Sequence, residues 1–307
     1  MKYDVIIIGG GPGAVAAGVY AARKSMKAAV IADQIGGQSV VSDGIENWIG
    51  EKLIPGPELA KKLTDHLEGY KDAIDLKVPE KVESVTKQDG DYHIVTNKET
   101  YITKSLVLCS GGRHRRLGII GEDKFEGKGV AFCATCDAPF FRDKDVAVVG
   151  GGNSGLEAVV DLLPYVNKVY LLVRDDAPHG DPVTLKEVEE SDKVTIIPYA
   201  DSKEVKGDVM VEGLVYEDNK TKESNELAVQ GIFVEIGSVP NSEIVKDLVD
   251  INDFGEVIVD HRTNATTEDG IFAAGDVTDG PYKQNNIAVG DAIKALLSAY
   301  DFAKKKK

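Results

Sequence analysis

The sequence has little of what marks secreted, membrane-spanning or disulfide-rich proteins. Only three cysteines occur in 307 residues, too few for a disulfide framework. No apolar run reaches the roughly 18 residues that a membrane span needs. The opening "MKYDVIIIGG" lacks the small-residue cleavage pattern of a signal peptide. We therefore expect a cytoplasmic protein with no membrane partner.

Basic residues are also outnumbered by acidic ones, with 36 Lys and Arg against 51 Asp and Glu and a net charge of -15. Binding to phosphate backbones requires clustered Lys and Arg, so this balance argues against nucleic acid as a partner. No short repeat occurs, which excludes a solenoid. The 42% hydrophobic and 28% charged composition fits a globular protein with a core, and the length favours two domains.

A glycine-rich turn lies near the start, in "YDVIIIGGGPGAVAAGVYAARKSMKAAVIAD". The pattern predicts strand, turn, helix and strand. Gly9, Gly11 and Ala14, with Pro12 between them, fit the fingerprint GxGxxG/A, where missing side chains permit a tight turn and close approach of a pyrophosphate. Asp33 follows the second strand, where a carboxylate can bond a ribose hydroxyl. A purely structural turn is the alternative, which the accompanying strand, helix and acid disfavour.

The same pattern recurs in "DVAVVGGGNSGLEAVVDLLPYVNKVYLLVRDD". Gly150, Gly152 and Gly155 occupy its fingerprint, and Asn153 and Ser154 lie in the same turn. Two such units predict two dinucleotide sites.

Two breaks in the pattern divide the chain. The strand in "SLVLCSGG" ends at a glycine pair near residue 112, and Gly237 and Pro240 follow the strand in "GIFVEIG". The segment "GIFAAGDVTDGPYKQNNIAVGDAIKALLSAYDF" has no partner sheet of its own, so we expect it to complete the first domain. The sequence thus predicts an α/β fold of two Rossmann-like, three-layer domains, the second inserted into the first. The first comprises residues 1–112 and 239–307, and residues 113–238 form the inserted domain.

The inserted domain carries the motif CxxC, formed by Cys133 and Cys136. Two thiols on one turn can close a disulfide, and a thiolate in such a motif often has a lowered pKa. Zinc is the alternative, but a structural zinc site usually needs four Cys or His ligands. The remaining Cys109 lies in an apolar strand, where we expect a small buried hydrophobe. We therefore favour redox chemistry and expect no metal.

Together these motifs resemble the low-molecular-weight thioredoxin reductases and the related flavoprotein that reduces bacterial peroxiredoxin. The likeness runs nearly end to end and is carried by "GGGPGA" at 9–14, "GGQ" at 36–38, "IENW" at 45–48, "CATCD" at 133–137, "GGGNSG" at 150–155 and "FAAGDV" at 272–277. The "GGGNSG" turn and the ending are closer to the second branch, whose additional N-terminal thioredoxin-like domain has no counterpart in the printed sequence.

The resemblance implies FAD in the first domain, NADPH or NADH in the second, and a homodimer. Carried over by motif, Gln38 and Asn47 would lie along the flavin, Asp276 would contact its ribityl or phosphate part, and Gln284 would stand at a helix end facing the ring. For Asn47 and Asp276 the alternative is turn chemistry, which Asn and Asp favour in any protein.

The resemblance also assigns the thiols. Cys136 would take electrons from reduced FAD, and Cys133 would form the mixed disulfide with a thioredoxin-like or glutaredoxin-like partner. Asp137 would carry the protons that thiol–disulfide exchange requires, with a plain turn or helix-end carboxylate as its alternative. The implied enzyme is an FAD-dependent disulfide reductase.

The electron donor is where the sequence departs from the family. Members that use NADPH commonly carry HRRxxxR after the second strand of the inserted domain, whereas this chain has "VRDDAPH". Arg174 remains, but Asp175 and Asp176 would repel a 2′-phosphate, and Val173 stands where NADH users tend to have an acid. Ferredoxin as donor, a peroxiredoxin system fed through a separate carrier, and a flavin-binding sensor stay as alternatives. The intact CxxC disfavours the sensor.

Overall fold

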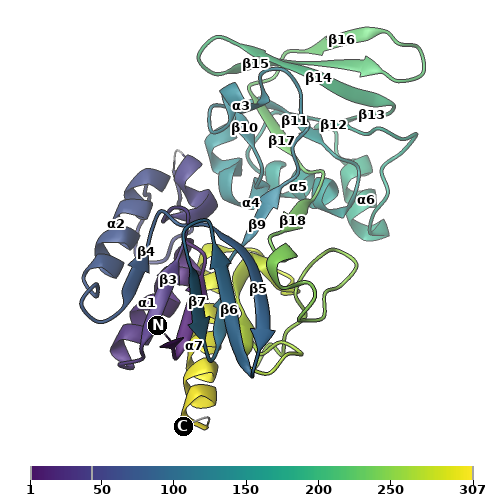
Figure 1. Ribbon diagram of the computed structural model, residues 1–307. Coiled ribbons are helices and arrows are strands. Elements are labelled where there is room, and N and C mark those ends of the chain that lie inside the picture. The colour runs from purple at the N-terminus through teal and green to yellow at the C-terminus, as the bar shows by residue number, and fades with distance from the viewer. Residues whose placement is uncertain (1, 43, 306–307) are drawn as a thin grey trace. The chain divides into compact units, whose positions relative to one another are not determined.

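The computed structural model describes residues 2–42 and 44–305 and divides into two compact units (Figure 1). Unit 1 comprises Met1–Gly44, Trp48–Arg113 and Val239–Lys307, and unit 2 comprises Ile45–Asn47 and His114–Ser238. The chain passes from unit 1 into unit 2 along β9 (Gly112–His114) and returns along β18 (Ser238–Pro240), and these strands form a two-stranded sheet. For comparison, the sequence predicts an insertion over residues 113–238.

Unit 1 is built on a five-stranded parallel sheet. Its order is β19 (Ile271–Ala273), β8 (Leu106–Leu108), β2 (Val5–Ile8), β3 (Ala28–Ile31) and β4 (Asp75–Lys77). All residues of β2 and β3 are buried, as expected of parallel strands covered on both faces. On one face α1 (Pro12–Arg23) packs against α7 (Asn285–Lys305). The late segment 271–305 therefore completes the sheet and helix layer that the first residues begin.

A second sheet covers the other face of unit 1, in the order β1 (Lys2–Tyr3), β7 (Thr100–Thr103), β6 (Asp91–Thr96) and β5 (Val82–Gln88). Strands β5, β6 and β7 form an antiparallel meander. Ile6 and Ile8 of the parallel sheet pack in one core with Tyr92 and Ile94 of β6. The remaining elements of this unit are α2 (Gly56–Glu68), η1 (Gly37–Val41), η3 (Glu243–Val245) and η4 (Gly275–Val277).

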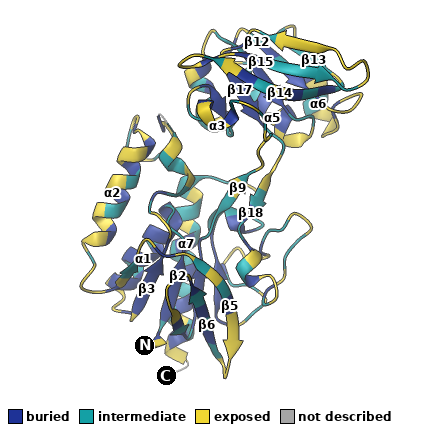
Figure 2. Cartoon of the chain, turned by 45° about the horizontal axis from the view of Figure 1, so that its top comes forward, coloured by how far each residue is buried: buried dark blue, intermediate teal, exposed yellow. Residues whose placement is uncertain are grey.

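Unit 2 repeats the plan with a second five-stranded parallel sheet. Its order is β10 (Val130–Ala131), β17 (Gly231–Val234), β11 (Asp145–Val149), β12 (Lys168–Leu172) and β13 (Val194–Ile197). Because side chains alternate across a strand, Val146 and Val148 face one core with α5 (Asn153–Leu162), whereas Ala147 and Val149 face the other. Figure 2 shows this buried interior in dark blue.

The second core of unit 2 is closed by an antiparallel sheet of β14 (Ala200–Gly207), β15 (Val211–Asp218) and β16 (Ser224–Leu227). The unit also contains α3 (Glu122–Phe125), α4 (Ala134–Asp137), η2 (Ala138–Phe141) and α6 (Pro182–Glu190). The predicted α/β fold with two Rossmann-like domains is confirmed. No helix within the described residues combines the length and apolar character needed to cross a membrane.

Candidate functional site

The first glycine turn follows β2 and is shaped by close backbone contacts. Gly9 has φ +130°, and a Cβ there would lie 2.1 Å from the carbonyl oxygen of Cys109. Only glycine fits this position without strain. A Cβ on Gly11, in contrast, would have nothing within 4 Å. The turn therefore packs tightly on the sheet at Gly9 and is open at Gly11, the position at which this fingerprint admits a pyrophosphate.

The start of α1 leaves backbone donors available at this opening. Gly11 is the N-cap with φ -72° and ψ 178°, Pro12 begins the helix, and no described side chain caps it. The first turn of a helix has N–H groups without intrahelical partners, and these favour a phosphate. Ala14 is fully buried, and Asp33 is exposed just after β3. These residues fit the phosphate and ribose of a dinucleotide.

Other expected flavin residues of unit 1 gather around the same turn. A Cβ on Gly37 would lie 3.0 Å from Cα of Gly11, which brings the segment that carries Gln38 against the turn. Gln38 donates from Nε2 to the carbonyl oxygen of Gly112 at 2.5 Å. A Cβ on Gly13 would lie 3.0 Å from the carbonyl oxygen of Ala288, in the first turn of α7. The turn therefore lies between η1 and the start of α7.

Asp276 and Gln284 also belong to this part of unit 1. A Cβ on Gly275, next to Asp276, would lie 3.0 Å from the side chain of Ala288. Burial raises the pKa of Asp276, and the nearby Lys283 ammonium opposes that shift. Gln284 directly precedes α7, and its carbonyl accepts the N–H of Ala288 at 2.9 Å. Unit 1 thus brings Gly11, Asp276 and Gln284 to one end of its parallel sheet, whereas Asn47, which was expected beside them, belongs to unit 2.

The second glycine turn, after β11, has the same construction. Gly150 has φ +134°, and a Cβ there would lie 2.2 Å from the carbonyl oxygen of Glu235. A Cβ on Gly155 would lie 1.9 Å from the carbonyl oxygen of Gly150, whereas Gly152 has nothing within 4 Å. Within the described part of the chain, no side chain caps α5 at Gly152. Unit 2 therefore has a second glycine turn with the shape and free backbone N–H groups that suit a phosphate.

The first helical residues after this turn are exposed. Asn153 and Ser154 both lie at the surface in the first turn of α5. The Asn153 side-chain oxygen accepts the N–H of Asp181 at 2.8 Å, which ties the turn to the start of α6.

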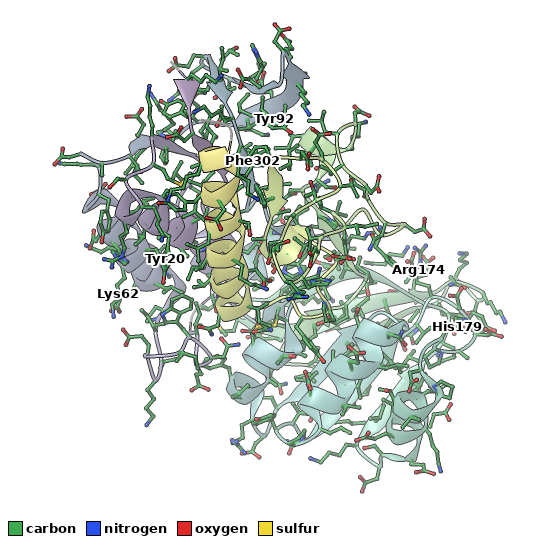
Figure 3. All side chains as sticks on the ribbon, turned by 90° about the horizontal axis from the view of Figure 1, so that it is seen from below. Tyr20, Lys62, Tyr92, Arg174, His179 and Phe302 are labelled. Atoms are coloured by element: carbon green, nitrogen blue, oxygen red, sulfur yellow. A yellow bond between two sulfur atoms is a disulfide. The ribbon has the colours of Figure 1, made fainter. Side chains whose placement is uncertain are left out.

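The end of β12 differs from what either nicotinamide donor prefers. Val173 is 2% exposed and packs against Gly151, where a Cβ would lie 2.6 Å from its Cγ1, so it faces inward. Arg174 is exposed and lies at the edge of unit 2 with His179 (Figure 3). Its Nε is 3.5 Å from Oδ1 of Asp201. The arginine expected to meet a 2′-phosphate therefore already faces a carboxylate.

Asp201 is held in its ionised form. It accepts a hydrogen bond from Lys203 at 2.7 Å, and this contact, with the charge of Arg174, lowers the pKa of its carboxyl. No local pattern in the sequence pointed to Asp201, which lies in β14 and meets the end of β12 only through the fold.

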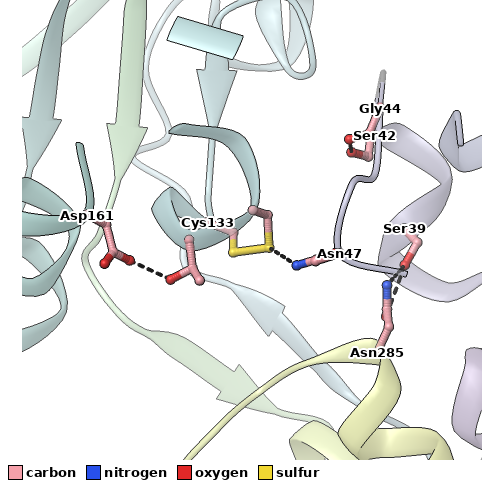
Figure 4. The surroundings of a disulfide bond; sticks show 9 residues. Ser39, Ser42, Gly44, Asn47, Cys133, Asp161 and Asn285 are labelled. Atoms are coloured by element: carbon pink, nitrogen blue, oxygen red, sulfur yellow. Dashed lines mark hydrogen bonds between the residues drawn. A yellow bond between two sulfur atoms is a disulfide. The ribbon is translucent and has the colours of Figure 1, made fainter. Parts of the chain in front are cut away.

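Cys133 and Cys136 form a disulfide, with 5.3 Å between their Cα atoms (Figure 4). Cys133 is the N-cap of α4, and its carbonyl accepts the N–H of Asp137 at 3.1 Å. Nδ2 of Asn47 lies 4.0 Å from Sγ of Cys136. Thr135, between the cysteines, donates its hydroxyl to Asp161 at 2.6 Å. The disulfide is thus framed by polar groups from three parts of unit 2.

The third cysteine is of another kind. Cys109 is free and buried, and burial raises the pKa of its thiol to about 12. Such a thiol stays protonated and serves as packing. Among the described residues no group of three or more His, Cys, Asp or Glu is placed to hold a metal ion.

Sequence reasoning missed one carboxyl near the disulfide. Glu235 follows β17 and faces the backbone N–H of Ala134, the residue after Cys133. Burial raises the pKa of Glu235 to about 8, against the effect of that N–H. An acid directly after an apolar strand, in "GIFVEIG", was the available signal.

Comparison with known proteins places these features in context. The sequence model of the family described as pyridine nucleotide-disulphide oxidoreductase matches residues 3–292. The structure is similar to the thioredoxin reductase of Streptococcus pyogenes MGAS5005, with a TM-score of 0.92, 33% identity and 99% of each chain covered. It is also similar to the thioredoxin reductase of Giardia duodenalis, with a TM-score of 0.90, 29% identity and 99% of each chain covered.

Two curated relatives carry different names. An alkyl hydroperoxide reductase subunit of Pseudomonas aeruginosa is 43% identical over 303 residues, covering 97% of this chain and 58% of the relative. The NADH dehydrogenase of Bacillus subtilis is 40% identical over 300 residues, covering 98% of this chain and 58% of the relative. The chain therefore spans little more than half the length of these relatives, in contrast to the full-length match with the thioredoxin reductase structures.

Proposed function

The chain belongs to the pyridine nucleotide-disulphide oxidoreductase family, and from this premise we propose that it reduces a thioredoxin-like protein through the Cys133–Cys136 dithiol. The observation that carries the proposal is the disulfide within unit 2, the same unit that holds the second phosphate-binding turn. Structural similarity to thioredoxin reductases supports a disulfide oxidoreductase activity.

Members of this family use FAD and NAD(P)H. Bound FAD supplies the two-electron step between the nicotinamide and the disulfide. We assign FAD to unit 1, where the open turn at Gly11 would hold the pyrophosphate and Asp33 the ribose. The residues of unit 1 that we assign to FAD are Gly9, Gly11, Pro12, Ala14, Asp33, Gln38, Asp276 and Gln284. Asn47, which belongs to unit 2, completes the proposed set. The set for the nicotinamide donor is Gly150, Gly152, Asn153, Ser154, Gly155 and Arg174.

The two cysteines have separate roles in this proposal. Cys136 would exchange electrons with the flavin. Cys133 attacks the disulfide of the partner. Each attack requires a thiolate, and each departing sulfur requires a proton. We assign that proton to Asp137, the residue that follows Cys136 in sequence.

A second candidate has specific support. The match with the alkyl hydroperoxide reductase of Pseudomonas aeruginosa favours a reductase that feeds a peroxiredoxin system through a separate carrier protein. In both cases the immediate acceptor is a thioredoxin-like or glutaredoxin-like disulfide, and we propose that the enzyme acts as a homodimer. The relative named NADH dehydrogenase favours NADH over ferredoxin as the donor.

Reduction assays test the proposal. Purified protein is mixed with NADPH, NADH or reduced ferredoxin without oxygen, and bleaching of the flavin identifies the donor. A thioredoxin-like protein is then added, and its thiols are counted. We expect catalytic thiol release with a nicotinamide donor. Flavin bleaching without any release of partner thiols would contradict a reductase and favour the sensor.

A further inference from the structure

Glu235 lies near the redox motif but has no role in the thiol–disulfide exchange proposed above. It is the first residue after β17, and its backbone carbonyl packs against Gly150, leaving no room for a Cβ there. Its side chain faces the backbone N–H of Ala134, which directly follows Cys133. The backbone of Glu235 is therefore fixed by the second glycine turn, and its carboxyl lies at the start of the redox helix α4.

The surroundings of this carboxyl oppose a negative charge. Glu235 is half-buried, and the charged groups that act on it are the carboxyls of Asp161 and Glu157 in α5 and of Asp137 in α4. Burial penalises the charged form and is the largest cause, and like charges add to it. The backbone N–H of Ala134 acts in the opposite direction. Their balance raises the pKa of Glu235 to about 8.

The other nearby carboxyls have different positions. Asp161 accepts a hydrogen bond from the hydroxyl of Thr135, which lies between the two cysteines. Asp137 follows Cys136 directly in sequence. β10 and β17 pair in parallel with Ala131 beside Phe233, so Glu235 follows β17 at the same level at which Cys133 follows β10.

We propose that Glu235 shares one proton with the Cys133 thiol and converts it into the thiolate that attacks the partner. This inference rests on the proposed dithiol function. When the disulfide is opened by two electrons from the flavin or from an added dithiol, the S–S bond breaks and both electrons stay on the sulfurs. The O–H bond of Glu235 breaks as an S–H bond forms on Cys133, leaving a carboxylate. The carboxylate takes the proton back when Cys133 attacks.

The raised pKa of Glu235, about 8, lets its carboxyl keep a proton at neutral pH, in the range where thiols ionise. Transfer between two groups of matched pKa costs little, and matching near the working pH is what proton-transfer groups require. A carboxyl with an ordinary pKa would be ionised at neutral pH and would have no proton to give.

The test follows ionisation of Cys133 in the full-length, flavin-containing protein. The background variant is Cys136→Ser, in which Cys133 is the accessible thiol because Cys109 is buried. Its rate of alkylation by iodoacetamide is measured from pH 5.5 to 10, and the labelled cysteine is identified by peptide mass. Two groups that share a proton titrate in two steps. We expect a rise to about half the final rate near pH 8 and a second rise at least one pH unit higher.

Added substitutions assign the second group. Glu235→Gln should give a single step, whereas Glu235→Asp should keep two, and Asp137→Asn should also keep two. Glu212→Gln, at an exposed position of β15, is the matched control and should not change the profile. One step in the background variant itself, or two steps that persist in Glu235→Gln, would overturn the proposal. Failure of dithiothreitol to open the disulfide of the unsubstituted protein would instead refute the dithiol function.

Discussion

Arg174 faces Asp201 across 3.5 Å between Nε and Oδ1, and Arg174 is the residue that we assign to a donor's 2′-phosphate. A guanidinium can bind a 2′-phosphate bidentately, but here a carboxylate competes for it. Val173, which an acid would replace in an NADH site, faces inward. The geometry thus adds to the sequence argument against sharp choice between the two donors.

We therefore expect NADPH and NADH to be used weakly, with kcat/KM values within about tenfold of each other, or less than about 1.4 kcal/mol of discrimination. Steady-state rates at equal partner concentration measure this. A preference of a hundredfold or more for either donor would show that the end of β12 selects one of them and would contradict this prediction.

Asp201→Asn should raise the NADPH preference, because it releases Arg174 for the 2′-phosphate. Exposed ion pairs are worth about 0.2–1 kcal/mol, so the ratio of the two kcat/KM values should change by up to about fivefold, and less at high salt. Asp208→Asn, at an exposed position of the same unit, is the control. An unchanged ratio in Asp201→Asn would show that Arg174 does not meet the donor.

In the first glycine turn, replacing glycine by alanine should have different effects at Gly9 and at Gly11. Purified protein should be yellow, with about one FAD per chain. Gly9→Ala should destabilise the protein by more than about 1 kcal/mol, because φ is +130° and the Cβ would meet the Cys109 carbonyl. Gly11→Ala has open space and should keep the stability of the apoprotein while losing flavin affinity.

Thermal unfolding of flavin-free protein and flavin content after reconstitution separate these effects. Equal loss of stability in both variants, or full flavin content in Gly11→Ala, would contradict a phosphate at this turn.

The two cysteines of the disulfide should give different products when each is replaced by serine. Cys136→Ser should let Cys133 trap a mixed disulfide with the partner, and Cys133→Ser should leave a Cys136 thiolate that perturbs the flavin spectrum. Both should lose turnover. Cys109→Ala is the control and should retain it, because that thiol is buried and protonated. Mass spectrometry of the trapped complex and absorbance spectra provide the measurements.

Glu235 predicts a pH dependence of stability. Its pKa is about 8 in the folded chain against an ordinary value of 4.5, so folding favours the protonated form. Its stabilising contribution is complete below about pH 4.5 and is lost as the pH rises through 8. Relative to the unsubstituted protein, Glu235→Gln should therefore gain at least about 1.4 kcal/mol between pH 5 and pH 8. Urea unfolding at the two pH values checks this, and equal pH dependence of the two proteins would contradict it.

Local signals in the sequence were sufficient for the elements that hold the site. Each glycine turn is bounded by an apolar strand and a helix within about 30 residues, so Gly9, Gly11, Gly150 and Gly152 could be placed from the pattern alone. The CxxC spacing likewise predicted a disulfide, which the structure contains.

Contacts between distant segments could not be read in the same way. Glu235 reaches the redox helix because β17 pairs with β10 and β11, strands that precede it by about a hundred residues or slightly less. Asp201 meets Arg174 because β14 follows β13 beside the end of β12. Strand order decides both contacts, and a single sequence carries no direct record of strand order.

Electron transfer through the dithiol is tested most directly by steady-state reduction of a thioredoxin-like protein by a nicotinamide donor, with the unsubstituted protein, Cys133→Ser and Cys136→Ser compared at equal flavin content. We expect turnover in the unsubstituted protein and its loss in both variants, while the donor still bleaches the flavin of each. If either variant kept most of the disulfide reductase activity, electrons would not pass through this dithiol.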